Sequence, residues 1–566
     1  MESRSITLAD EKDRASTPSS HSSIDIFTQT EINNLPKDHE GPLLKADAEG
    51  ENEKDEGEYP TRARLAFVII ALLLSIFLVA LDMTIVATAI PKITEEFAGL
   101  DLVGWYGSAY FLTVGAFQST WGKAYKYFPL KISFLLAILL FELGSLICAA
   151  APNSTALIVG RAISGLGGGG IASGAYIIIA FSAPPRQRPA FTGLLGAANG
   201  LASVIGPLIG GVFADHLTWR WCFWVNLPIG GLSAAIILFF FTTPAQAVPT
   251  KATWREKFLQ MDLPGAFVVM GAIVCYILAL QWAGQSKAWN DSSVIGTLVG
   301  FFVITILFCV IEYYQGERAM IVGRILKSRN VSVNMALIFF LGGGFFLLMY
   351  YIPIYFQVVS GVSASQSGIR NLPLILGTVI ATIISGGAIS ATGQFLPWLI
   401  AGTGMATLGS GLLYTLGTDS PPAQWIGYQA LAGLGVGAAL QVPIITGQAL
   451  SQASDLSSVT AMILFCQTIG GALFVSAGEV AFANVLVARL LVHVPNLNPA
   501  KVVAVGVTQV RVVFPAEEIP GIIDAYMDGL KANFGIAIAA TGLAFAISFL
   551  SKWTSLKGKV VVAGAA

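Results

Sequence analysis

The chain has 566 residues, of which 55% are hydrophobic and only 11% are charged. A soluble domain carries roughly 25% charged residues, so this composition excludes an ordinary soluble protein and indicates a membrane protein with many spanning segments. The formal net charge of -1 argues against a nucleic-acid partner, because such binding needs a basic patch. The four histidines are scattered and the five cysteines form no CxxC pair, so we expect neither a metal site nor a disulfide framework.

The first 63 residues are rich in Ser, Thr, Asp, Glu and Lys. We interpret them as a disordered cytosolic tail, because so few apolar groups cannot offset the entropy lost on ordering. Beyond this tail lie fourteen apolar segments that are long enough to cross a bilayer, which takes about 20 helical residues. We expect these helices at about 65–91, 103–122, 130–151, 155–181, 189–214, 220–243, 263–284, 293–314, 332–359, 367–390, 396–416, 424–450, 457–488 and 532–551.

These segments predict an all-α polytopic membrane protein with fourteen transmembrane helices in a 6 + 2 + 6 arrangement. Lysines and arginines concentrate in alternate short loops, which places the N-terminus in the cytosol. The even number of helices then returns the C-terminus to the cytosol. The predicted parts are the tail 1–63, an N-terminal six-helix bundle 64–245, two inserted helices with their cytosolic loops 246–330, a C-terminal six-helix bundle 331–552 and a short cytosolic tail 553–566.

Two sequons fall in outer loops in this orientation, at Asn153 and Asn290, and both are candidates for glycosylation. Asn290 is the better candidate, because Asn153 lies close to the membrane. The one long outer loop, about 489–531, contains FPAEEIPGIIDAYMDGLKANF. We expect this stretch to form a short amphipathic helix that either lies over the mouth of the protein or, in the interpretation that we favour, packs against its rim.

Four ionisable residues lie deep within predicted spans: Asp82, Glu142, Arg161 and Glu479. At about 1.5 Å per residue, Asp82 and Glu142 lie about 13 Å from the outer ends of their helices, and Arg161 about 9 Å. A guanidinium at this depth costs at least a few kcal/mol, so it needs a carboxylate partner, a water-filled cavity, or both. Asp82 and Glu142 are the candidate partners, and spacing alone does not say whose face meets that of Arg161.

Two interpretations of these charges remain open. In the functional one, Asp82 or Glu142 carries a proton, because burial favours the neutral carboxyl while Arg161 favours the ionised form. In the structural one, a static buried ion pair fixes helix packing. Glu479 is a further proton-coupling candidate in the second half.

Neutral polar and aromatic side chains within the spans predict a large cavity for a partly apolar ligand. The fifth helix contains Gly206, Pro207, Gly210 and Gly211; the proline removes a helix hydrogen bond, and the glycines permit bending or tight packing. Such a helix suits the boundary between two rocking halves. No GxxxxGK[ST] loop and no nucleophile–base or metal constellation occurs, so we expect neither ATP-driven transport nor an enzyme. The cavity-lining candidates are Gln118, Asn199, Gln357, Gln441 and Gln467.

An internal repeat links the fourth and twelfth predicted helices. LIVGRAISGLGGGG from Leu157 aligns without a gap with WIGYQALAGLGVGA from Trp425. The alignment places Gln429 at the position of Arg161. Matching helices in the two halves are expected for parallel repeats related by an axis along the membrane normal.

The stretch WRWCFWVNLP from Trp219 gathers tryptophans around Arg220 and ends near Asn226. Such aromatic and polar residues are typical of the membrane–water interface, so we expect this stretch to form an interfacial girdle.

Four motifs together resemble the major facilitator superfamily, in its fourteen-helix drug:H⁺ antiporter branch, over nearly everything from Leu65 to Lys552. They are LDMTIVATAIP from Leu81, LIVGRAISG from Leu157, GPLIGG from Gly206 and WRWCFWVNLP from Trp219. The resemblance implies proton coupling through Arg161 and export through the Gly206–Gly211 motif. In the loop GKAYKYFPLK, Lys126 stands where the family usually has Asp, a departure that is similar to fungal pumps for mycotoxins and other secondary metabolites, such as the aflatoxin and HC-toxin carriers.

The resemblance implies a monomeric plasma-membrane efflux pump that exchanges an amphipathic organic molecule, such as a fungal secondary metabolite or toxin, for protons. The proton gradient would be the energy source, without a cofactor, and the partners would be the small-molecule substrate, protons and the lipid bilayer. Protonation of Asp82 or Glu142 from outside would shift the balance between inward-open and outward-open states. The alternative is an importer or vacuolar-membrane transporter of the same fold, for a siderophore or a basic amino acid.

Overall fold

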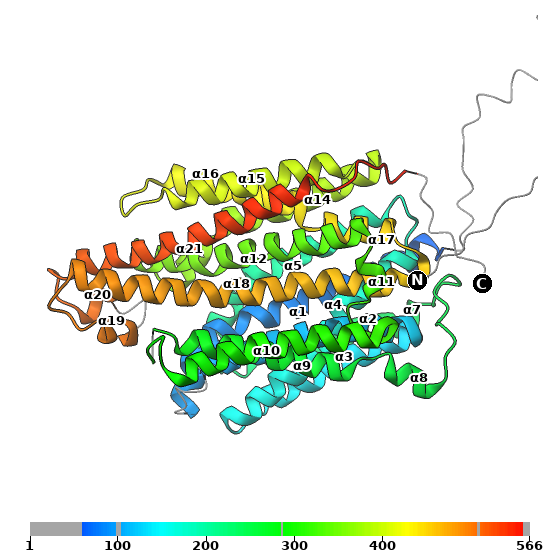
Figure 1. Ribbon diagram of the computed structural model, residues 1–566, viewed down its shortest axis with the longest axis horizontal. Helices are drawn as coiled ribbons and strands as arrows, with labels where there is room; N and C mark the ends of the chain where they lie inside the picture. The colour runs from blue at the N-terminus through cyan, green and yellow to red at the C-terminus, as the bar shows by residue number, and fades with distance from the viewer. Residues whose placement is uncertain (1–58, 98–102, 285–286, 506–509, 558–566) are drawn as a thin grey trace, which may run out of the picture. The chain divides into compact units, whose positions relative to one another are not determined.

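A computed structural model describes residues 59–97, 103–284, 287–505 and 510–557. Most of the predicted tail 1–63 and the end of the predicted tail 553–566 lie outside these described residues. Within them, long helices run roughly alongside one another and are joined by short loops (Figure 1). The prediction of an all-α membrane protein is confirmed: among the described residues, thirteen helical segments are long and apolar enough to cross a membrane.

A further long helix, α2 (Val103–Tyr127), is more polar than these thirteen segments and carries Gln118, Lys123 and Lys126. Two of the predicted spans are broken: Val225 separates α6 from α7, and Gln441 separates α16 from α17. The helices that make up the spans besides α2 are α1 (Arg62–Phe97), α3 (Leu130–Ala149), α4 (Ser154–Ser182), α5 (Arg188–His216), α6 (Trp221–Trp224), α7 (Asn226–Phe240), α9 (Leu263–Trp282), α10 (Ser292–Gln315), α12 (Arg329–Val358), α14 (Leu372–Thr392), α15 (Leu396–Tyr414), α16 (Pro422–Leu440), α17 (Val442–Ala449), α18 (Leu456–His493) and α21 (Ile519–Ser548). Short elements join them: α8 (Trp254–Leu259), η2 (Gly316–Arg318), α11 (Gly323–Leu326), α13 (Ala364–Arg370), η3 (Ala453–Asp455), α19 (Pro499–Val505) and α20 (Val510–Val513).

The helices pack as two groups with matching neighbours. In the first group α4 packs on α2 and α3, α1 on α5, and α7 on α1 and α3. In the second, α16 packs on α14 and α15, α12 on α18, and α21 on α12 and α15. The two groups meet where α5 packs on α14 and where α2 packs on α18. Each contact in the first group has a counterpart in the second when α4 is matched to α16 and the other helices are matched in chain order. The predicted repeat requires this agreement.

Paired glycines carry this repeat into the packing. A side-chain carbon on Gly165 would clash with the backbone of α2, and one on Gly433 with the backbone of α14. Gly167 and Gly435 make the same kind of approach to the backbones of α3 and α15. Without a hydrophobic drive between helices in lipid, such small residues set how closely the backbones approach.

This close approach predicts a large stability difference between two identical substitutions in α16. A Gly435→Ala methyl would overlap the amide nitrogen of Ala406, whereas no atom lies within 4 Å of the corresponding methyl in Gly427→Ala. Overpacking costs about 1–3 kcal/mol, so we expect Gly435→Ala to lower the melting temperature of the detergent-solubilised protein. Gly427→Ala should leave it unchanged or raise it, because alanine favours the helix. Equal melting temperatures would contradict the packing of α16 on α15.

The prediction of a separate helix in the outer loop 489–531 is wrong. α18 continues to His493 and α21 begins at Ile519, so most of the predicted amphipathic segment is the first part of the last long helix. Ile522, Tyr526 and Leu530 are buried against the neighbouring helices. Their spacing of four residues places them on one helix face, and that face packs sideways into the second group instead of lying across the mouth.

The inserted hairpin of α9 and α10 lies beside the first group in Figure 1. α9 contacts both α2 and α18, whereas α10 packs mainly on α9 and on η2. Only 11% of the most apolar stretch of α10 is buried inside the protein, against 44% of that of α9. α9 is therefore the member of the hairpin that contacts both groups of helices.

Candidate functional site

Arg161 forms a buried ion pair with Asp82, which joins α4 to α1. The side chains are 1% and 0% exposed, respectively. Arg161 Nε also donates to the carbonyl of Tyr106 at 2.8 Å, and its guanidinium lies 4.4 Å from the centre of the Tyr110 ring. The fourth helix thus holds a cation that is paired, hydrogen-bonded and covered by an aromatic ring.

Asp82 has a second partner from the beginning of α7. Asn226 Nδ2 donates to Asp82 Oδ1 at 3.2 Å and to Ser145 Oγ at 3.1 Å. Asn226 is a polar residue near the end of the WRWCFWVNLP motif, and the sequence gives no signal for its contact with Asp82. The motif by itself predicts only a place in the interfacial girdle. The cluster therefore ties α1, α3, α4 and α7 together.

Glu142 does not take part in the ion pair. It lies on α3 against Gly230 of α7, whose missing side chain leaves room for the carboxyl group. Neither of its carboxyl oxygens has a hydrogen-bond partner among the described residues. Of the two candidate partners for Arg161, the geometry selects Asp82.

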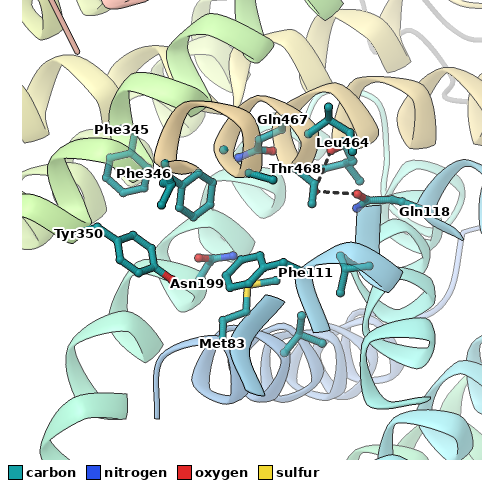
Figure 2. Close-up of a pocket in the computed structure, with 18 of the residues that line it drawn as sticks. Met83, Phe111, Gln118, Asn199, Phe345, Phe346, Tyr350, Leu464, Gln467 and Thr468 are labelled. Atoms are coloured by element: carbon teal, nitrogen blue, oxygen red, sulfur yellow. Dashed lines mark hydrogen bonds between the residues drawn. The ribbon is translucent and has the colours of Figure 1, made fainter. Parts of the chain in front are cut away.

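A cavity of about 490 Å³ lies between the two groups of helices, and Arg161 is part of its wall. Of the predicted cavity residues, Gln118, Asn199, Gln441 and Gln467 line it. Figure 2 shows Gln118, Asn199 and Gln467. Gln357 does not, because its amide donates to Ser367 Oγ at 3.0 Å instead.

The rest of the wall is largely apolar and aromatic. Figure 2 shows Phe345, Phe346 and Tyr350 of α12 on one side, with Phe111 of α2 and Met83 of α1 facing them. Such a lining, with a few amides among rings, suits a ligand with a large apolar part and a few polar groups. A hydrogen bond of 2.8 Å from Thr468 Oγ1 to Gln118 Oε1 bridges α18 and α2 across this space.

Glu479 is the acidic residue of the cavity wall. Its side chain is exposed to the cavity, and it has no hydrogen-bond or ion-pair partner within the part of the chain that the structure describes. It differs from Asp82, which is covered by its partners. The described residues contain no group of three or more His, Cys, Asp or Glu side chains placed to hold a metal ion.

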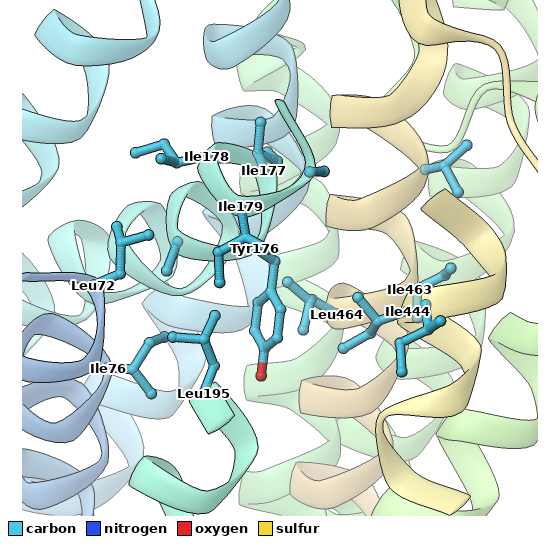
Figure 3. Close-up of a cluster of buried hydrophobic side chains, with 14 of the residues drawn as sticks. Leu72, Ile76, Tyr176, Ile177, Ile178, Ile179, Leu195, Ile444, Ile463 and Leu464 are labelled. Atoms are coloured by element: carbon cyan, nitrogen blue, oxygen red, sulfur yellow. The ribbon is translucent and has the colours of Figure 1, made fainter. Parts of the chain in front are cut away.

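The cavity is closed at the end of the bundle where α2 ends and α5 begins, which we call the inner end. A side-chain carbon on Gly193 of α5 would lie 2.7 Å from the Thr382 carbonyl oxygen of α14. On the other side Gly122 of α2 packs directly on Ala461 of α18. Between these contacts the Tyr176 ring lies beside Leu464 (Figure 3). Direct packing between the two groups therefore seals the inner end.

A cluster of charges covers this seal. Arg324 of α11 donates to both oxygens of Asp455, at 2.8 and 3.0 Å, and Lys126 of α2 lies 3.3 Å from the same carboxylate. Glu317 also pairs with Arg324, at 2.9 Å, and the two carboxylates raise the pKa of the guanidinium well above its ordinary value. Lys126, the residue that departs from the family motif, thus contacts an aspartate immediately before α18. We call Asp455, Arg324, Lys126 and Glu317 the inner clamp.

The predicted kink region of α5 lies against α1. A side-chain carbon on Gly206 would clash with Thr84, whereas Gly211 has open space around it. Pro207 is half-buried inside a helix that continues to His216, and Gly210 is buried. In this conformation, Gly206 of the motif lets α1 and α5 pack closely.

The outer girdle joins α1 to the turn before α6. Arg220 donates to both carboxylate oxygens of Glu96, at 3.0 and 2.8 Å. Trp219 Nε1 donates to Glu96 Oε2 at 2.7 Å. Glu96 lies beyond the apolar span Arg62–Val86, and these hydrogen bonds hold the pKa of its carboxyl below the usual value. The contact is therefore kept in mild acid and is lost only as the pH falls through that lowered value.

The predicted glycosylation sites are both exposed. Asn290 lies in the loop between α9 and α10. Asn153 caps α4, because its side chain accepts a hydrogen bond of 2.9 Å from the amide of Ala156. The Asn153 side chain therefore serves as the N-terminal cap of α4.

A cavity between two matched groups of membrane helices, with the arginine of a buried ion pair in its wall, is the arrangement expected of a membrane transporter. The profile of the Major Facilitator Superfamily matches residues 72–475. The chain belongs to this superfamily.

The similar proteins agree with that assignment. The chain is 47% identical over 530 residues to the MFS-type transporter grgE of a Penicillium species, covering 94% of each chain. It is 44% identical over 533 residues to the MFS-type efflux pump MFS1 of Arthroderma benhamiae, covering 94% of this chain and 99% of the pump. Among solved structures it is similar to the proton:xylose symporter XylE, with a TM-score of 0.55 and 14% identity over 86% of this chain and 95% of that one. That last likeness concerns the fold alone.

Proposed function

We propose that the protein exports an amphipathic small organic molecule, of the kind represented by fungal secondary metabolites, in exchange for protons. The observation that carries this proposal is the cavity itself: it is large, lined by rings and amides, and has Arg161, the buried partner of Asp82, in its wall. The relative named as an efflux pump, which aligns over nearly its whole length, supports the export direction.

The inner end faces the cytosol in this proposal, in keeping with the lysines and arginines of its short loops. In this proposal the described conformation, whose inner end is sealed by packing at Gly122 and Gly193, is the outward-facing state of the cycle. A substrate loaded from the cytosol would be released in this state. Alternating access requires that the seal at Gly122 and Gly193 open in the other half of the cycle.

Asp82 is the proton acceptor that the geometry favours. A proton that enters the cavity from outside reaches the wall at Arg161, whose partner is Asp82. Neutralising Asp82 would leave the guanidinium without its counter-charge, and a buried unpaired cation is costly. Movement of Arg161 toward the cavity would then favour the return to the inward-open state. Glu479 offers a second carboxylate that protons from outside can reach.

The proposal is tested by the accumulation of the dye rhodamine 6G in cells that produce the protein. Cells with the wild-type chain should retain less dye than cells with Asp82→Asn, at equal amounts of protein in the plasma membrane. Greater retention with the wild-type chain would indicate import, and localisation to the vacuolar membrane would contradict the site that we propose.

A further inference from the structure

The two seams between the groups of helices are closed in different ways. At the seam of α5 and α14, Gly193, Gly196 and Gly200 let the two helices touch along two turns. At the seam of α2 and α18, the close glycine contacts are those of Gly122 and Gly115, toward the inner end. Farther out, Gly107 of α2 lines the cavity and has no atom within 4 Å of a side-chain carbon built on it.

The inserted helix α9 occupies this second seam. Tyr276 Oη donates to the carbonyl of Leu473 in α18 at 3.1 Å, and the Phe267 ring meets that of Phe117 in α2 edge-on at 5.7 Å. Residues of α2, α9 and α18 also share one buried apolar cluster. α9 is thus fastened to one helix of each group, on the lipid side of the cavity.

Three residues of α9 reach the cavity. Ile273, Ile277 and Gln281 all line it. Their spacing of four residues places them on one helix face, so they form a continuous strip. Two of them are branched apolar side chains and the third ends in an amide, which repeats the chemistry of the cavity as a whole.

We propose that α9 forms one wall of the substrate site, and that Ile277 and Gln281 determine the size and polarity of the molecules that the protein accepts. This inference rests on the proposed function. Ile273 and Ile277 contact the apolar part of an amphipathic substrate, and the Gln281 amide hydrogen-bonds a carbonyl or hydroxyl group of it. The inserted hairpin is therefore part of the recognition machinery as well as a lateral wall against the bilayer.

Cysteine labelling tests the wall without any substrate. In a background with the five native cysteines replaced by alanine, Gln281→Cys should react with a membrane-impermeant maleimide added outside. Ile306→Cys is the matched control, because Ile306 lies on α10 and is 64% exposed on the lipid-facing hairpin surface. The control should stay unlabelled. No reaction at Gln281→Cys would overturn the proposal, whatever the protein transports.

Size selectivity tests the role in recognition. Ile277→Trp narrows the cavity and should lower the rate of rhodamine 6G efflux relative to that of the smaller ethidium by roughly tenfold, the scale on which an apolar pocket discriminates by size. Ile306→Trp should leave the ratio unchanged. If Gln281→Cys were labelled but Ile277→Trp left the ratio of the two efflux rates unchanged, α9 would line the cavity without determining substrate size, and its role in specificity would be overturned. If the wild-type protein exported neither dye, the proposed function and its specificity would fail together, while labelling would still decide the position of α9.

Discussion

Arg161→Ala is expected to abolish efflux and to destabilise the protein. The substitution leaves Asp82, which is 0% exposed, without its cation. Removing one partner of a buried ion pair costs about 3–5 kcal/mol, because an uncompensated charge remains. Arg161→Lys should not restore efflux, since a lysine cannot donate to Tyr106 and Asp82 in the geometry of the guanidinium. Thermal melting in detergent and dye efflux measure the two effects.

The double substitution Asp82→Asn with Arg161→Gln separates folding from transport. Replacing both charges removes the uncompensated one, so the double variant should melt closer to the wild-type protein than Arg161→Ala does. It should still fail to couple efflux to protons. If the double variant pumped at the wild-type rate, the ion pair would be a packing feature only.

Glu142→Gln is the matched control for Asp82→Asn. Both change a carboxyl group to an amide in the first group of helices, but the Glu142 oxygens have no hydrogen-bond partner among the described residues. We therefore expect Glu142→Gln to leave the dependence of efflux on external pH intact. If Glu142→Gln lost the dependence on external pH while Asp82→Asn stayed active, Glu142 and not Asp82 would be the residue that carries the proton.

Asp455→Ala should loosen the inner clamp and favour the inward-open state. Asp455 is 6% exposed and holds both Arg324 and Lys126, so its removal leaves Lys126 facing Arg324, which keeps only Glu317 as a partner among the described residues. Arg324 is 52% exposed, which reduces the energy of its pair through solvent screening. We expect a shift of about 1–3 kcal/mol, or roughly 5- to 150-fold in the balance of the two states.

The shift is measured by cysteine labelling at the bottom of the cavity. In the cysteine-free background, Leu464→Cys should react faster with a maleimide applied to the cytosolic side when Asp455→Ala is present. Lys327→Ala is the control, because Lys327 is an exposed cation next to α11. Unchanged labelling with Asp455→Ala would show that the clamp does not hold the inner end closed.

The buried charges illustrate what can be predicted from the sequence. The cost of a guanidinium at membrane depth requires a partner for Arg161, and depth limits the candidates to Asp82 and Glu142. Choosing between them needs the rotation of each helix about its axis, which depth does not give. The same limit explains Gln357, which lies in a span but turns toward Ser367.

Other features depend on contacts between distant segments. The contact of Asn226 with Asp82 is not predictable from the motif, because a polar residue beside tryptophans fits an interfacial girdle equally well. The amphipathic stretch at Ile522 has the pattern of a surface helix, and only its neighbours show that its apolar face is buried. The part of α9 in the cavity is equally hidden, because the inserted helices have no counterpart in the repeat that relates the two halves.

Proton-driven transport in inside-out membrane vesicles tests the central claim most directly. The vesicle lumen then corresponds to the exterior, and an acidic lumen should drive rhodamine 6G into it through the wild-type protein. A protonophore should abolish this accumulation, and Asp82→Asn should show none. Accumulation of the dye at the same rate without a pH gradient, or in the Asp82→Asn variant, would contradict proton-coupled export through the Asp82–Arg161 pair.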